Sequence, residues 1–260
     1  MHTWVPAGLI FLSALGYVGA VMWQWRAGRA WSLWRVTAWL AGCMLLIQAL
    51  APGVMVLGHH DFRWHMAQHL VIGMLAPLAL VLASPVTLLM RALPVRAARV
   101  LTALLRSGYV RVVSHPVVAL MLNTGVMWLL YITPLYRASL ESSWLHALVH
   151  IHFLLAGFLF CWSVLAGPDQ AARTASLRCR GGALFLSIAA HSILAKMMYG
   201  YLWPHDVPHD PEQIRAAAQL MYYGGGLAEL LLIIALCAMT LNGRSSVRYA
   251  PAQPFQPARQ

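Results

Sequence analysis

The chain has 260 residues, of which 60% are hydrophobic and only 10% are charged, and its formal net charge is +11 because 18 Lys and Arg oppose 7 Asp and Glu. Soluble domains carry about 25% charged residues, so this composition excludes a cytosolic enzyme. The four cysteines have no CxxC spacing, which excludes a disulfide framework. The basic residues are spread between apolar runs without a recognition motif, so we expect no nucleic-acid partner.

Long apolar runs recur along the whole chain. A helix needs about 20 apolar residues to cross about 30 Å of hydrocarbon. Runs of that kind predict seven transmembrane helices, near residues 4–24, 36–57, 64–84, 116–136, 144–166, 183–203 and 218–241. The first run lacks the basic region and cleavage site of a signal peptide, so we expect it to remain as a span. The predicted fold class is therefore all-α, a polytopic membrane protein.

The segments between these runs alternate in charge. Four of them hold fourteen arginines and a single acid, Asp169; the arginines are Arg26, Arg29, Arg35, Arg91, Arg96, Arg99, Arg106, Arg111, Arg173, Arg178, Arg180, Arg244, Arg248 and Arg259. The other segments hold three arginines and five acids. Arginine-rich loops stay in the cytoplasm, so the pattern predicts an outside N-terminus and a cytoplasmic C-terminus.

Two stretches outside the spans have their own character. Near residues 86–114, arginines alternate with apolar residues at helical spacing, which favours an amphipathic helix on the inner leaflet over a solvated basic loop. We assign residues 1–243 to one seven-helix membrane domain. The Pro-containing segment 244–260 is expected to be a disordered cytoplasmic tail.

Two pairs of histidines mark the outer ends of the third and fifth predicted spans. His65 and His69 are four residues apart, as are His146 and His150, so each pair projects from one helical face. If the two spans are neighbours, the four imidazoles form one layer near the outer face. His152 lies on a different face of its helix and is left out.

Further potential ligands surround this layer. Met66 is adjacent in sequence to His65, and four histidines lie in the predicted outer segments, namely His59, His60, His205 and His209. Imidazoles together with a thioether suit Cu(I). Spacing alone leaves two other interpretations open, because facing helical histidines can also ligate heme iron or simply pair helices.

The sixth and seventh spans carry buried polar residues of their own. His191 and Lys196 lie in the sixth span, and Glu229 lies in the seventh at about the depth of His191. Either a Lys196–Glu229 or a His191–Glu229 pair would neutralise the buried charge. The same residues could instead form a proton or metal path, so His191 and Glu229 are secondary candidates for a metal site.

The third span also carries a resemblance. His65-Met66-Ala67-Gln68-His69, followed by Ala76-Pro77 and Ser84-Pro85, resembles the HMxQH…AP…(A/S)P signature of the multi-span CtaG-type cytochrome c oxidase assembly factors. The likeness extends over most of the chain, to His146 and His150, to His191 with Tyr199-Gly200-Tyr201, and to Gln219 with Gly225-Gly226. It implies a polytopic bacterial membrane protein that helps to mature a heme–copper oxidase.

These observations combine into one leading hypothesis. The chain is expected to be an assembly factor of the bacterial inner membrane, without enzymatic activity, that binds Cu(I) near the periplasmic face. A cytochrome c oxidase subunit would receive the metal, a periplasmic donor would supply it, and membrane lipid would surround the protein. The alternatives are a b-heme oxidoreductase with bis-histidine ligation and a proton or metal transporter.

Overall fold

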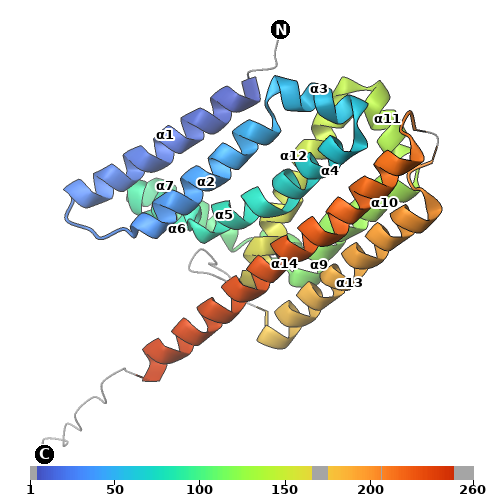
Figure 1. The fold of residues 1–260 in the computed structure, drawn as a ribbon. Helices are drawn as coiled ribbons and strands as arrows, with labels where there is room; N and C mark the ends of the chain where they lie inside the picture. Colours follow the sequence, from blue (N-terminus) through green and yellow to red (C-terminus); the bar gives the residue numbers. More distant parts are fainter. Residues whose placement is uncertain (1–4, 166–174, 206, 249–260) are drawn as a thin grey trace, which may run out of the picture.

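The computed structural model describes residues 5–165, 175–205 and 207–248, with side chains up to residue 241. Every regular element in these ranges is a helix. Five stretches are long and apolar enough to cross a membrane: α1 (Val5–Arg26), the Phe62–Leu82 stretch, α12 (Ser143–Leu165), α13 (Leu177–Tyr201) and the Pro211–Leu241 part of α14 (Pro211–Arg248). Two bent helix pairs raise the number to seven if each pair is one span. The chain is thus an all-helical membrane protein, and its bundle is drawn in Figure 1.

The second predicted span, 36–57, is bent. Helix α2 (Leu33–Ala49) ends before Pro52, and α3 (Pro52–His60) leaves at 55°. Proline cannot donate a helical hydrogen bond, and it drives the preceding residue out of the helical region of backbone conformation. Ala51, which precedes Pro52, accordingly has an extended backbone. The bend carries His59 and His60 over the end of the bundle.

The third span contains three segments. Helix α4 (Phe62–Leu70) runs into a π-helical turn, η1 (Val71–Leu75), and continues as α5 (Ala76–Leu82). Asp61 caps α4, because its carboxylate accepts a hydrogen bond from the Arg63 amide at 2.9 Å. Gln68 of α4 donates to the carbonyl oxygen of Ala49 at 2.8 Å, so it satisfies a backbone group that the α2–α3 break leaves free.

The fourth span is also interrupted. Helix α9 (Pro116–Leu120), the π-helical turn η2 (Met121–Gly125) and α10 (Val126–Ile132) precede Pro134. Helix α11 (Leu135–Glu141) then turns by 79°. The predicted span 116–136 therefore ends early, because Thr133 and Pro134 break the helix.

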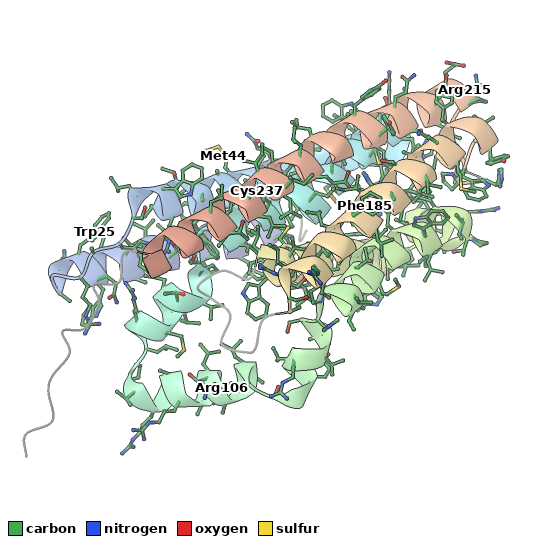
Figure 2. All side chains as sticks on the ribbon, turned by 90° about the horizontal axis from the view of Figure 1, so that it is seen from below. Trp25, Met44, Arg106, Phe185, Arg215 and Cys237 are labelled. Atoms are coloured by element: carbon green, nitrogen blue, oxygen red, sulfur yellow. The ribbon has the colours of Figure 1, made fainter. Side chains whose placement is uncertain are left out.

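The basic connection forms three short helices where one amphipathic helix near 86–114 was expected: α6 (Pro85–Ala92), α7 (Val95–Leu105) and α8 (Gly108–Val113). Pro94 and Gly108 lie at the breaks. Helix α7 buries no residue, and Val95 and Val100 expose 66% and 71% of their surface. The segment extends away from the main bundle, as Arg106 shows in Figure 2.

The bundle packs α12 against the third span and α14 against α4 and α13 (Figure 1). Gly157 of α12 lies directly on the backbone carbonyl of Gly73 in η1, where a Cβ atom would collide. The absence of a side chain thus lets the two histidine-bearing helices approach closely. Helix α14 begins at Pro211 and reaches Arg248, beyond both ends of the predicted span 218–241 and into the segment assigned to the tail. Residues 249–260 lie outside the described part.

Candidate functional site: a cluster of buried histidines

Four imidazole rings meet where α3, α4 and the start of α12 come together. We call His59, His65, His146 and His150 the histidine cluster. The ring of His65 lies 6.3 Å from that of His146 and 6.5 Å from that of His150, centroid to centroid. His146 and His150 are 4.4 Å apart, and His59 stacks on His146 at 4.6 Å. The predicted third and fifth spans are therefore neighbours, and three of the four predicted rings lie together.

The rings of the cluster are buried. His65, His146 and His150 expose only 3%, 5% and 8% of their surface, whereas His59 is half-buried. Both ring nitrogens of His65 and Nε2 of His146 are buried without a hydrogen-bond partner. Unpaired buried polar atoms are costly, so these nitrogens are donors and acceptors that a ligand or water could satisfy.

Aromatic residues close the side of His65 that faces away from α12. Tyr136 of α11 lies 4.7 Å from the His65 ring and Phe62 lies 5.8 Å away. Tyr131 of α10 packs edge-on at 6.4 Å. All three aromatic residues are at most 1% exposed. The 79° turn between α10 and α11 brings Tyr136 back over His65, and no pattern in the sequence indicated that these tyrosines would line the site.

His69 lies one helical turn deeper than His65, as its position on α4 implies, and its ring packs against a different set of residues. Its ring packs edge-on against Phe153 at 4.6 Å and near Tyr131 at 6.0 Å. It lines a cavity of about 10 Å³ together with His191 and Glu229. The single layer of four rings is therefore incorrect, since the fourth ring belongs to a second polar group one helical turn further into the bundle.

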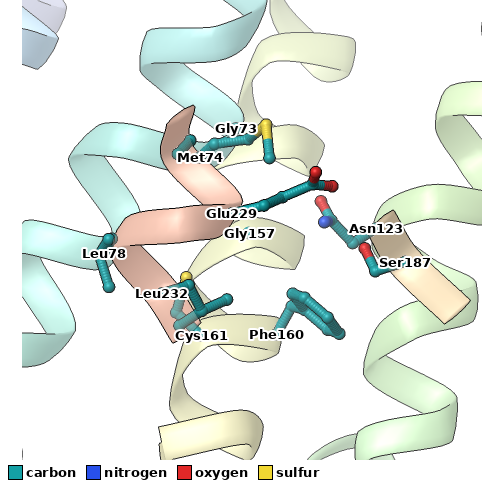
Figure 3. Close-up of a pocket in the computed structure, with 11 residues that line it drawn as sticks. Gly73, Met74, Leu78, Asn123, Gly157, Phe160, Cys161, Ser187, Glu229 and Leu232 are labelled. Carbon is teal, nitrogen blue, oxygen red and sulfur yellow. The ribbon is translucent and has the colours of Figure 1, made fainter. Parts of the chain in front are cut away.

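That second group is centred on Glu229. Nδ1 of His191 lies 3.6 Å from Oε1 of Glu229, and both side chains are 4% exposed. Figure 3 shows the Glu229 carboxylate pointing toward Asn123 and Ser187 in an adjoining cavity of about 20 Å³. Cavities of this size hold about one water molecule each. Of the two pairings considered from the sequence, the structure contains His191–Glu229.

Met66 is fully buried and belongs to the core cluster that also contains Phe62 and Tyr131, and its role as an auxiliary ligand stays a prediction. One pairing considered from the sequence is absent from the structure. Lys196 does not reach Glu229; its Nζ lies 5.4 Å above the Tyr222 ring on the surface. Nε2 of His152 donates to the carbonyl oxygen of Leu122 at 2.9 Å, which places this ring outside the cluster, as expected.

The loop histidines divide into two kinds. His60 and His205 are exposed. His209 is buried, with Nε2 3.1 Å from the Tyr136 hydroxyl and its ring stacked on Phe62 at 5.2 Å. Burial lowers the pKa of His209, and the nearby Asp61 carboxylate only partly opposes that shift. His209 therefore supports Tyr136, which covers His65.

A glycine makes room for the His191 ring. A Cβ atom at Gly225 of α14 would overlap that ring, whereas the neighbouring Gly226 has open space around it. The glycine run in the seventh span thus has a specific use, namely the close approach of an imidazole.

Within the described residues, the histidine cluster does not form a complete set of ligands for a metal ion. Among the described residues, no three His, Cys, Asp or Glu side chains are arranged to hold one metal ion together. The cluster instead offers ring pairs. Two imidazoles that bind one ion from opposite sides have centroids about 6 Å apart, given metal–nitrogen distances of about 2 Å. The His65–His146 and His65–His150 separations are close to this value.

The fold and the site together define a class: an all-helical membrane protein with buried, unpaired imidazoles where several helices meet. The chain belongs to the cytochrome c oxidase caa3 assembly factor family (Caa3_CtaG), whose model matches residues 15–242. This agrees with the resemblance seen in the sequence and supports a role in cytochrome c oxidase assembly.

Curated relatives are bacterial and longer. An uncharacterised protein of Mycobacterium leprae is 36% identical over 68% of this chain, and one each from Mycobacterium bovis and Mycobacterium tuberculosis are 36% identical over 72% of it. The chain spans only 28% to 29% of the length of these relatives. No solved structure matches the chain.

Proposed function

We propose that the protein aids the maturation of a heme–copper oxidase by binding Cu(I) in the histidine cluster and passing it to an oxidase subunit. The observation that carries this proposal is the buried His65 ring, whose two nitrogens have no hydrogen-bond partner and whose centroid lies 6.3 and 6.5 Å from those of His146 and His150. Family membership supplies the oxidase context. The location proposed for this activity is the periplasmic side of the bacterial inner membrane, where a copper donor would load the site.

The arrangement suits transfer better than permanent storage. His146 and His150 lie at nearly equal distances from His65, so an ion bound to His65 can exchange one α12 ring for the other. His59 stacks on His146 and is half-buried, which places an additional imidazole between the buried rings and the surface. Imidazole ligands in a low coordination number suit Cu(I), which then leaves for a site with more ligands. His69, one turn deeper, is a further ligand available after the ion has entered.

The surroundings favour a bare ion over heme. A porphyrin between two axial imidazoles needs a flat gap that extends well beyond both rings. Tyr136 and Phe62 pack directly against the His65 ring. A porphyrin at His65 would have to fit beside these two aromatic residues, whereas a bare ion needs only the space between two rings.

Copper content tests the site. The protein is purified, exposed to Cu(I) under reducing conditions, desalted and measured by elemental mass spectrometry. We expect near-stoichiometric copper in the wild type, little in His65→Ala, and wild-type copper in His152→Ala. The last variant is a matched control because His152 is on the same helix as His146 and His150 but outside the cluster. Full copper in His65→Ala would overturn the site, and stoichiometric iron with a Soret band would replace copper with heme.

A cellular assay tests the role. In a host that lacks its own copy of the protein, the wild-type gene and the His65→Ala and His152→Ala variants are expressed at equal membrane levels. We expect copper-dependent oxidase activity with the wild type and His152→Ala, and a several-fold loss with His65→Ala. Equal activity in all three strains would show that assembly does not use the cluster.

A further inference from the structure

Lys196 is the single lysine among the 18 Lys and Arg residues of the chain. It lies on α13, five residues before the helix ends at Tyr201, and its side chain is exposed. The only contact of its ammonium group among the described residues is the face of the Tyr222 ring, 5.4 Å away. An aromatic ring attracts a cation without neutralising it, so the positive charge remains available to an anion.

The ammonium group lies in a groove between α13 and α14. The groove has a volume of about 270 Å³, and the polar groups around it come from Lys196, Tyr199, Gln219, Tyr222 and Tyr223. Ile193 and Leu220, on the same two helices, are 49% and 37% exposed. Exposed apolar residues on a membrane-spanning helix face lipid, so the groove opens sideways into the bilayer and away from the histidine cluster.

Its depth is that of the membrane interface. The exposed Arg215–Glu212 ion pair, 2.7 Å long, marks the part of α14 that lies in water. Gln219 and Tyr222 follow Arg215 by four and seven residues, or about 6 and 10 Å along the helix. The boundary between head groups and hydrocarbon spans about this range. Tyrosines concentrate at that level, and lysine side chains extend from below toward it.

We propose that this groove binds the head group of an anionic phospholipid. The phosphodiester would accept hydrogen bonds from the Lys196 ammonium and from the tyrosine hydroxyls and Gln219 amide, while an acyl chain lies along Ile193 and Leu220. Charge complementarity favours this occupant, because the head group of an anionic phospholipid such as phosphatidylglycerol, unlike that of phosphatidylcholine, carries no positive charge that would repel the Lys196 ammonium. A transmembrane helix is about 10 Å wide, which is too bulky for a groove of this volume. The lipid site does not depend on copper binding.

The lone lysine makes the proposal directly testable, since an amine-specific acylating reagent marks one internal position. The detergent-purified protein is stripped of lipid, titrated with phosphatidylglycerol or phosphatidylcholine, and acylated briefly. The peptide that contains Lys196 is then quantified by mass spectrometry. We expect phosphatidylglycerol to slow acylation several-fold with saturation, and phosphatidylcholine to have little effect. Equal rates with both lipids would overturn the proposal.

Variants provide a second measurement. Native mass spectrometry counts the phosphatidylglycerol molecules retained by wild type, Lys196→Arg, Lys196→Gln and Arg137→Gln. Arg137 is the matched control, a surface cation of α11 that is already paired with Glu141 at 3.2 Å. We expect only Lys196→Gln to lose a tightly held lipid. Retention of the lipid by that variant would overturn the proposal. The proposal would also fail if Lys196 in native membranes stayed protected from acylation after phosphatidylglycerol was replaced by neutral lipid. That second result would assign the groove to a polypeptide partner.

Discussion

The imidazole of His191 occupies the space in which a side chain at position 225 would lie. We predict that Gly225→Ala destabilises the protein by about 1–3 kcal/mol, because a packed interior does not accept an added methyl group without strain. Thermal unfolding in detergent measures the change. The control is Gly226→Ala, which adds the same methyl group into open space and is expected to leave stability unchanged or slightly raised.

A double variant separates packing from helix effects. In Gly225→Ala/His191→Ala the added methyl group no longer meets a ring. The loss of stability caused by Gly225→Ala should therefore be much smaller when His191 is already alanine than in the wild type, as a double-mutant cycle measures. If the alanine costs as much with His191 absent as with it present, the overlap is not the cause.

At the scale of single residues, the sequence indicated which side chains could act as ligands but not which side chains lie next to them. The i,i+4 spacing correctly placed His146 and His150 together on one helical face, and His65 joins them because the third and fifth spans are neighbours. It could not show that His69, one turn deeper, meets Phe153 and shares a cavity with His191. Which helices surround a ring at each depth depends on packing, and spacing within one helix carries no information about it.

At the scale of elements, Asp61 fixes the start of the helix that carries His65. Its carboxylate accepts the Arg63 amide and pairs with the Arg63 guanidinium, and the latter interaction holds the pKa of Asp61 below its usual value. We predict that Asp61→Ala costs about 1 kcal/mol of unfolding free energy and that Asp61→Asn, which retains a capping oxygen, costs less. Thermal unfolding at neutral pH compares the two variants.

The same cap predicts a pH dependence. Because the folded-state pKa is lowered, the contribution of Asp61 is fully present at neutral pH and is lost as the pH falls below about 4, the usual value. The wild type should therefore lose its advantage over Asp61→Asn in acid. A difference between the two proteins that stays constant from neutral pH into acid would contradict the ion-pair contribution.

Breaks within the elements were only partly predictable. Pro52 and Pro134 are visible in the sequence and explain the bends of 55° and 79°, yet an apolar run alone reads as one straight span. The π-helical turns η1 and η2 have no sequence signal that we recognised. They depend on how each helix packs, which a hydropathy pattern does not contain.

For the whole molecule, the charge pattern predicts an orientation in the membrane. In the structure, α11, the end of α13 and the start of α14 lie at one end of the bundle, whereas α7 lies toward the other end, near the end of α1 (Figure 1). We predict that Arg137→Cys is labelled by an impermeant thiol reagent from the outside of intact cells, and that Arg106→Cys is labelled only after the cells are opened.

The parent chain has native cysteines, of which Cys237 is exposed on α14 and Cys179 is half-buried on α13. Labelling is therefore read at the peptide that contains the new cysteine. The reverse pattern of labelling would place the histidine cluster on the cytoplasmic side and remove the periplasmic copper route.

The π-helical turn η1 sets the rotational phase between the two halves of the third span. A π-turn contains one residue more than an α-turn would, and each residue of an α-helix advances the side chains by about 100°. Deleting a single residue within Val71–Leu75 would restore a regular helix and leave α4 in nearly its present rotational phase, because the extra residue is the one that the π-turn accommodates. If instead all five residues became α-helical while α5 stayed in place against α2 and α12, all of α4 would turn by roughly a quarter of a revolution, carrying His65 away from α12 and bringing a different face of the helix to the bundle.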